Sequence, residues 1–353
     1  MTSLAEVVGV VIGVDTHKHS HTAAAINAAT GAELGTLTAA TDPDGYTDLV
    51  GLADEHGGLR AWAIEGSGGY GAGLVRHLRD AGEWVIELDR PDRPARRHGA
   101  KSDPIDAVRA GREALARTKL SEPRAAGERA ALAVRLAARR SAVDSACDAQ
   151  RQVHALITAA PECIRSRFRG ESTTSMLRIA GQLRTRRGWD VEANATATTL
   201  RTLAKRIAVL RAEADEHERE ILAIVRSWRP DLLDVVGVGP IVAATVLCAW
   251  SHAGRVHSDG AFAMLGGVCP IPASSGQTIR HRLNRSGDRR LNQALHTVVL
   301  TRLRHDPATK AYRDRRRAEG KSDRDIKRCL KRYVARQLFR QLESGVPDGL
   351  DRP

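Results

Sequence analysis

The chain has 353 residues, more than one ordinary hydrophobic core organises, so we expect two or three domains. Its formal net charge of +13 predicts a polyanionic partner, most simply nucleic acid. The five cysteines are scattered without a Cys-x-x-Cys pair, which argues against a zinc site and a disulfide framework. The start lacks signal-peptide features and no apolar run approaches the roughly 20 residues of a membrane span, so we expect a cytoplasmic protein with no membrane partner.

The chain opens with a short apolar, β-branched run, Val7–Val14, which stops at Asp15. A continuous run of this length predicts a strand that is buried on both faces. An acid at the carboxyl end of such a strand points into the crevice where open α/β sheets hold their ligands. Asp15 is therefore the first candidate site residue.

Three strands followed by alternating helices and strands indicate a mixed sheet flanked by helices. The strand 60–64 also ends in an acid, Glu65, and a glycine-rich break follows it. The other predicted elements are strands 22–27, 33–38 and 84–88, and helices 42–56 and 70–81.

A basic, proline-containing loop at 90–101 precedes a helix predicted over 102–117. Asp103 is expected at its cap and Pro104 in its first turn, as helix starts prefer. Asp103 and Asp106 are three residues apart, so their carboxylates share one face of that turn.

Long Ala-, Arg- and Glu-rich helices are predicted between Pro123 and Trp228. Within 198–225 the apolar positions alternate spacings of three and four, which predicts a coiled-coil arm. His217 falls on this seam, where a packed or register-setting residue is expected more often than a ligand. The seam consists of Leu200, Leu203, Ile207, Leu210, Ala214, His217, Ile221 and Ile224.

A compact region begins near Pro230. Gly237 and Gly239 precede an apolar helix at 241–250 and resemble the turn of a helix-hairpin-helix, whose backbone N–H groups approach a phosphate; a plain turn between helices is equally compatible. The stretch 280–340 then carries 20 Lys or Arg against 6 Asp or Glu. So one-sided an excess favours phosphate contacts over a merely solvated face.

Two strand-end acids and the Asp103/Asp106 pair predict a metal site. Clustered carboxylates repel one another unless cations hold them, which favours Mg²⁺ or Mn²⁺. Two such cations would support in-line displacement at phosphorus. The alternative reading is a helix cap at Asp103 and an ordinary surface acid at Glu65. Ser274 and Ser275 lie in a loop, where serines are usually turn residues, and no Ser-His-Asp spacing supports hydrolase chemistry.

Two sets of motifs stand out along the chain. The amino-terminal motifs are I-G-V-D-T-H-K at 12–18, A-I-E-G-S-G-G-Y at 63–70 and K-S-D-P-I-D-A at 101–107. The carboxyl-terminal motifs are V-V-G-V-G-P at 235–240, M-L-G-G-V-C-P-I-P-A-S-S-G at 264–276 and N-R-S-G-D-R-R-L-N-Q-A-L at 284–295. Together they resemble one transposase family, that of the IS110 insertion sequences and the Piv DNA invertase. The resemblance covers nearly the whole chain and keeps the order of both sets.

The resemblance implies an RNase H-like (RuvC-like) DEDD domain at 1–122, a coiled-coil oligomerisation arm at 123–229, and a small helical domain with a serine loop at 230–345. It implies a recombinase that cuts and rejoins DNA in the bacterial nucleoid, some members being guided by a structured bridge RNA. The metal-binding and catalytic acids would be Asp15, Glu65, Asp103 and Asp106, and the serine Ser275, since the family's serine directly precedes a glycine.

The partners expected from this reading are double-stranded DNA at the element ends and target, a guide RNA and further copies of the chain as a dimer or tetramer. Two alternatives remain open: a metal-dependent junction-resolving nuclease with a structural serine, and a catalytically silent nucleic-acid scaffold. The residues expected to contact nucleic acid are Gly237, Gly239, Arg280, Arg282, Arg285, Arg289 and Arg290.

Overall fold

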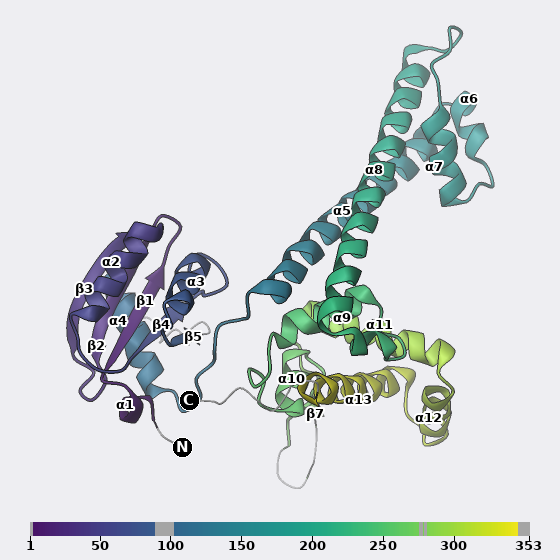
Figure 1. Ribbon diagram of the computed structural model, residues 1–353. Helices are drawn as coiled ribbons and strands as arrows, with labels where there is room; N and C mark the ends of the chain where they lie inside the picture. The colour runs from purple at the N-terminus through teal and green to yellow at the C-terminus, as the bar shows by residue number, and fades with distance from the viewer. Residues whose placement is uncertain (1–2, 89–101, 275–277, 279–280, 345–353) are drawn as a thin grey trace. The chain divides into compact units, whose positions relative to one another are not determined.

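The protein is seen in a computed structural model that describes residues 3–88, 102–274, 278 and 281–344. The chain forms two compact units, residues 1–125 and 126–353 (Figure 1). The predicted boundary between an arm and a third domain falls inside the second unit and stays a prediction. The basic loop predicted at 90–101 lies outside the described residues.

The first unit is built on a five-stranded mixed sheet of order β3-β2-β1-β4-β5. The first three strands are antiparallel neighbours, and β4 and β5 add in parallel to β1, so the predicted mixed sheet is confirmed. Its elements are α1 Leu4–Val7, β1 Val10–Thr16, β2 Ser20–Asn27, β3 Glu33–Ala40, α2 Pro43–Asp54, β4 Arg60–Glu65, α3 Ala72–Asp80, β5 Val85–Leu88 and α4 Asp103–Ala116.

The first strand starts later and ends later than its apolar run predicts. Val7 closes the short helix α1, and Asp15 lies inside the strand instead of after it. The reason is the antiparallel partner: β2 continues the ladder past the apolar residues, with Asp15 opposite Thr22 and Thr16 opposite His21. A hairpin ladder holds polar residues in strand conformation as readily as apolar ones.

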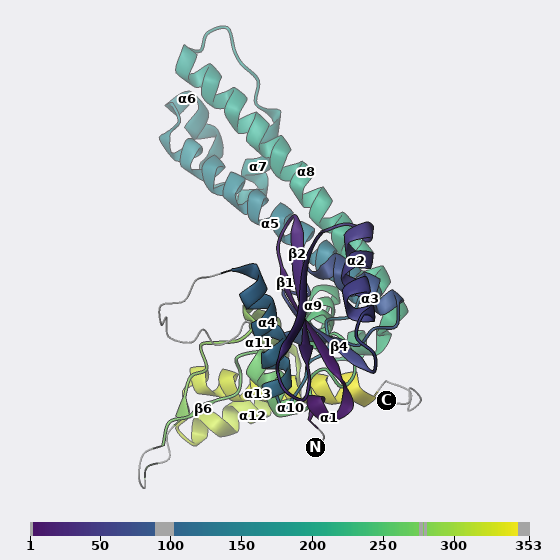
Figure 2. The ribbon, with the colours of Figure 1, turned by 90° about the vertical axis from the view of Figure 1, so that its left-hand side faces the viewer.

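The two faces of this sheet are covered by different helices (Figure 2). Ile12 and Ile64 pack with α2 and α3 on one face, whereas Val11 and Ala63 pack with α4 on the other. Successive residues of a strand point to opposite faces. Asp15 and Glu65 therefore belong to the face that α4 covers.

Glycines let α4 lie directly on the central strand. A Cβ on Gly13 would collide with the Ala107 carbonyl oxygen of α4, and one on Gly111 would lie 2.8 Å from the Ile26 side chain. This close approach brings the first turn of α4, with its two acids, to the carboxyl end of β1.

We expect Gly13→Ala to destabilise the first unit by about 2–3 kcal/mol, because the new Cβ would collide with backbone atoms of α4 and a Cβ has no rotamer that could relieve the collision. Gly51→Ala is the matched control, since Gly51 lies in α2 with nothing within 4 Å of a new Cβ. It should be neutral or stabilising by up to ~1 kcal/mol. Urea titrations of the three proteins followed by circular dichroism measure both effects, and equal midpoints would contradict the packing argument.

The second unit is helical. The predicted helices at 198–225 and 241–250 are confirmed within longer or equal elements, and a two-stranded ribbon is added near its middle. Its elements are α5 Gly127–Ala159, α6 Glu162–Arg165, η1 Ser166–Phe168, α7 Thr173–Gln182, α8 Val191–Trp228, η2 Pro230–Asp234, α9 Pro240–Trp250, α10 Asp259–Leu265, β6 Ile271–Pro272, β7 His281–Arg282, α11 Arg289–His305, α12 Pro307–Ala318 and α13 Asp323–Ser344.

The longest helices, α5 and α8, run antiparallel beside each other, and α6 and α7 lie at the end of the pair remote from α9 (Figures 1 and 2). The seam positions Leu200, Ile207 and Ile221 are buried. His217 lies between the two helices with its Nδ1 3.3 Å from Arg135 Nη1, so it is packed as predicted. The seam of α8 is thus buried, at least in part, against α5 of the same chain.

The rest of the unit packs α9, α10, α11 and α13 around one apolar core. None of the helices in the described ranges is both long and apolar enough to cross a bilayer. None of the five cysteines, all of which the structure describes, forms a disulfide.

Candidate active site

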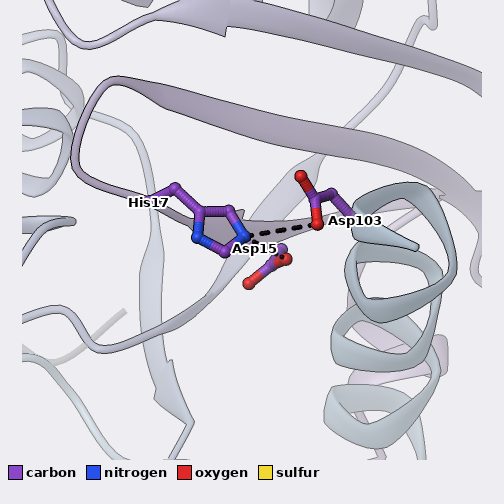
Figure 3. A group of neighbouring side chains, drawn as sticks. All are labelled: Asp15, His17 and Asp103. Atoms are coloured by element: carbon purple, nitrogen blue, oxygen red, sulfur yellow. Dashed lines mark ion pairs between the residues drawn. The ribbon is translucent and has the colours of Figure 1, made fainter. Parts of the chain in front are cut away.

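Three side chains from two elements meet at the end of β1 (Figure 3). His17 Nε2 lies 3.2 Å from Asp15 Oδ2 and 3.3 Å from Asp103 Oδ1, so the imidazole stands between the two carboxylates. One potential metal-ligand atom from each of the three residues lies within 4.8 Å of the others. The structure therefore brings together two of the four predicted acids.

The first turn of α4 supplies Asp103 and Asp106. The helix cap is Ser102, with Asp103 as the first helical residue, so the prediction of Asp103 as the cap is wrong by one position. The difference matters because a capping carboxylate would be occupied by backbone N–H groups, whereas Asp103 faces His17. Asp106 forms an ion pair of 3.0 Å with Arg109, one helical turn further on.

Glu65 closes β4, the parallel neighbour of β1, on the face shared with Asp15. Thr16 Oγ1 donates a 2.9 Å hydrogen bond to the Glu65 carbonyl oxygen and ties the two strand ends together. Ser67 Oγ lies 2.6 Å from Glu87 Oε1, which fastens the glycine-rich loop that follows. Glu65 is not a member of the Asp15–His17–Asp103 group.

The electrostatics of the site favour a bound cation. Burial raises the pKa of the Asp15 carboxyl, His17 opposes that shift, and the charges of Asp103 and Asp106 add to it. A raised pKa means that the ionised form is disfavoured here, because negative charges crowd a partly dry corner. The nitrogen-bearing side chains of His17 and Arg109 already lie against the acids. The donor set and its charge therefore fit a divalent metal ion.

His17 is the residue that the sequence reasoning missed. It lies in the quoted motif 12–18, but no role was assigned to it. The available signal was its spacing, since a residue two positions after Asp15 at a strand end returns to the same side. Imidazole nitrogen is also a common metal ligand.

The serine loop is carried on the β6–β7 ribbon, whose described stem pairs Ile271 with Arg282 and Pro272 with His281. Ser274 is exposed at this ribbon. Ser275 and Arg280 lie outside the described residues, so their roles stay predictions.

At the predicted turn, Gly237 packs closely against α11, whereas Gly239 has open space around it. Gly237 has φ +87°, a conformation that favours glycine, and a Cβ there would lie 3.1 Å from the Val298 carbonyl oxygen. Arg302 Nε donates to the Val236 carbonyl oxygen at 2.8 Å. Gly239 caps α9 without a side-chain hydrogen bond.

Two transposase sequence models match the chain, in the order in which its motif sets occur. A DEDD transposase model for IS110 elements matches residues 12–160, and a model described as the transposase IS116/IS110/IS902 family matches residues 230–314. The first span holds all four acids and the second holds the glycine turn and serine loop. The chain belongs to the IS110 family of insertion-sequence transposases.

Proteins of known insertion elements are similar to this transposase. It is 27% identical to an uncharacterised 42 kDa protein of insertion element IS900 from Mycobacterium paratuberculosis, over 88% of this chain and 89% of that protein. It is 28% identical to an uncharacterised 43.6 kDa protein of insertion element IS110 from Streptomyces coelicolor, over 41% of this chain and 36% of that one. The similarity to the first spans both units.

The family assignment makes this protein an enzyme that cuts and rejoins DNA. Its DEDD domain implies a divalent metal ion, which agrees with the charge arrangement around Asp15. The mixed sheet with flanking helices fits an RNase H-like DEDD domain.

A DNA-binding transposase needs exposed cationic side chains. The described residues of the basic stretch 280–340 include arginines that are paired with acids and arginines that are not. In its carboxyl-terminal part some arginines of α12 and α13 pair with nearby acids: Arg313 with Asp314, Arg316 with Glu319, Arg317 with Asp323 and Arg328 with Asp325.

The amino-terminal part is different. Among the described residues, no carboxylate pairs with the exposed side chains of Arg282, Arg285, Arg289 and Arg290. Arg289 and Arg290 open α11, where the helix dipole disfavours positive charge. Buried Asn284 fixes the turn before them by accepting from Ser286 N at 2.9 Å. A rigid turn that displays unpaired cations suits phosphate contacts.

Proposed function

We propose that this transposase exchanges DNA strands with Mg²⁺ or Mn²⁺ held by its acids and with Ser275 as the nucleophile. The observation that carries the metal half is the meeting of Asp15 and Asp103 around His17 Nε2. The serine half rests on the family motif, because Ser275 lies outside the described residues.

In this proposal Asp15, Glu65, Asp103 and Asp106 hold the metal. A bound metal would neutralise the charge that develops on the phosphate under attack. Asp15 and Asp103 already face each other, whereas Asp106 would exchange its contact with Arg109 for the cation. His17 would then give up its place between two carboxylates or join the ligands.

Ser275 Oγ would attack the scissile phosphorus, releasing one DNA end and leaving the other as a phosphoserine ester. A serine hydroxyl is a weak nucleophile at neutral pH and needs a base or cation beside it. The arginines that follow the loop, Arg282 and Arg285, would balance the phosphate charge. We further propose a composite site, in which the acids and the serine loop converge on DNA only in an assembled dimer or tetramer.

The remaining parts of the proposal follow the family. The sheet would be a RuvC-like domain, the α5–α8 pair a coiled-coil arm, and the turn at Gly237 a helix-hairpin-helix-like phosphate contact. A structured guide RNA would select the target. Inspection of the DNA beside the gene for a structured non-coding stretch, complementary to the element ends and the target, tests that last part.

One experiment separates the readings of the activity. The protein is incubated with Mg²⁺ and a nicked DNA substrate that carries an element end, and protein-linked DNA is scored on a denaturing gel. A linked strand supports the serine transposase. Metal-dependent cleavage without linkage supports the junction-resolving nuclease, and binding without cleavage supports the silent scaffold.

We expect neutralisation of Arg282, Arg285, Arg289 and Arg290 by glutamine to weaken DNA binding at all sequences, because phosphate contacts position without specifying. The slope of log affinity against log salt should flatten by about one unit per lost contact. Fluorescence anisotropy at several salt concentrations measures it. Arg313→Gln, which breaks an ion pair on α12, is the control, and an unchanged slope in the fourfold variant would show that these arginines face only solvent.

A further inference from the structure

The far end of the α5–α8 pair carries a surplus of arginine that the proposed function does not use. Residues 161–190 contain seven Arg against three Asp or Glu. Glu162 is already paired with Arg165 and Arg169, and Asp190 caps α8 by accepting from Ala193 N at 2.7 Å. The acids of this segment therefore leave most of its positive charge unbalanced.

Three of these arginines, Arg184, Arg186 and Arg187, crowd into the exposed loop that joins α7 to α8. In the part of the chain that the structure describes, no carboxylate pairs with any of them. We call Arg184, Arg186 and Arg187 the tip arginines. Along α5 and α8 some arginines do find acids, as Arg139 does with Glu218 at 2.7 Å.

The loop that carries the tip arginines is fixed, which distinguishes it from an ordinary solvated tail. Asn194 Oδ1 accepts from Arg186 N at 3.0 Å, and Asn194 Nδ2 donates to the Trp189 carbonyl oxygen at 3.0 Å. Leu183 is buried at the loop's start. The Arg186 guanidinium lies over the Trp189 ring, 5.4 Å from its centroid. The cations are therefore displayed from a rigid frame, which lowers the entropy cost of binding an anion.

A groove lies beside this loop and adds a surface against which a strand can pack. Its lining includes the hydroxyl-bearing Thr185 and Thr199, together with Val191, which is 87% exposed at the start of α8. Hydroxyls next to guanidinium groups are the side chains that commonly contact the sugar-phosphate backbone.

We propose that the tip arginines and this groove bind the phosphodiester backbone of duplex DNA, at a distance from the catalytic elements of the second unit. Duplex DNA is chosen because the family acts on DNA. In its choice of DNA the inference rests on the proposed function. It gives the α5–α8 pair a contact with the substrate in place of a purely structural role. A contact of this kind holds DNA without reading its sequence.

The test compares two triple variants that remove equal charge from the arm. Arg184→Gln with Arg186→Gln and Arg187→Gln removes the tip arginines. Arg140→Gln with Arg151→Gln and Arg219→Gln removes three exposed arginines from the shafts of α5 and α8. Salt-dependent binding of full-length protein to a random-sequence duplex should show a slope flatter by about two to three units for the tip variant. The shaft variant should change it by less than one unit.

A second measurement places the DNA. Thr185→p-benzoylphenylalanine should crosslink to the duplex on irradiation, whereas the same substitution at exposed Asp215 on α8 should not. Equal salt slopes for the two triple variants, or a crosslink from Asp215 alone, would overturn the inference. A change of salt slope in the tip variant that is seen only with an RNA hairpin of equal charge would also overturn the inference. Strand cleavage by the wild type is scored separately. If the wild type cleaves DNA and the two triple variants have equal salt slopes, only the tip contact is rejected. If the wild type does not cleave and the tip variant still has the flatter slope, only the proposed chemistry is rejected.

Discussion

Asp15→Asn should stop strand cleavage while leaving DNA binding close to that of the wild type. The substitution keeps the size of the side chain but removes the charge from the most buried member of the Asp15–Asp103 pair. Changes behind a metal's ligands typically cost 10- to 100-fold in affinity or activity, so loss of a ligand itself should cost at least about 10²–10³-fold in rate. Asp106→Asn should act in the same way.

Metal binding can also be measured without catalysis, from the unfolding temperature. Mg²⁺ should raise the unfolding temperature of the wild type, because a ligand of the folded state stabilises it, and should raise that of Asp15→Asn much less. Asp48→Asn, at an exposed acid of α2, is the control and should behave as the wild type in both assays. Turnover by the wild type in excess chelator would remove the metal from the proposal.

Ser275→Ala should eliminate the covalent protein–DNA adduct and with it recombination, without unfolding the protein. Without the hydroxyl no phosphoserine ester forms, and a loss of a nucleophile that acts in concert with its surroundings reaches many orders of magnitude. In the sequence, Ser275 falls between β6 and β7 and not within a helix of the second unit. Thermal unfolding and DNA binding should therefore remain those of the wild type.

Ser274→Ala is the matched control for this substitution, because the two serines are adjacent and only Ser275 directly precedes a glycine. It should retain most of the adduct formed on a nicked substrate. A Ser275→Ala protein that recombines as fast as the wild type would leave the metal-dependent resolving nuclease as the better account. Loss of the adduct from Ser274→Ala alone would move the nucleophile by one residue.

Much of the first unit could be predicted because its apolar runs coincide with its strands. The runs at 22–27, 33–38 and 60–64 fall within β2, β3 and β4, and two of them are followed by glycine breaks. The start of β1 could not be predicted in this way. Val7 is as β-branched as the strand that follows it, and the helix α1 is set by Ser3, whose N–H bonds the Glu6 side chain at 2.9 Å.

The candidate site was predicted as a set of acids, and its arrangement needed the structure. Spacing shows that Asp103 and Asp106 share a helix face, but it does not show that Ser102 is the cap. Nor does it show that α4 approaches β1 closely enough to bring Asp103 to His17. That approach is possible because Gly13 and Gly111 have no Cβ. A glycine that is needed for its missing Cβ leaves no signal in composition or periodicity.

The seam of α8 shows a second limit of sequence reasoning. Spacings of three and four establish that one face of a helix is buried, but they do not name the partner that buries it. Leu200 and Ile207 pack in a cluster that contains Val153 and Ile157 of α5 in the same chain. These seam positions are therefore already buried within one chain, and contacts between copies of the chain would use other surfaces.

The antiparallel pair of α5 and α8 also acts as a ruler. An α-helix lengthens by 1.5 Å per residue and turns by about 100°. Seven residues inserted at matching points of both helices would move the arginine-rich loop outward by about 10 Å and turn it by only about 20°. Four residues would turn it by about 40°. The length of these two helices thus sets how far the enzyme reaches along its substrate. Insertions of whole heptads change that length without altering the seam.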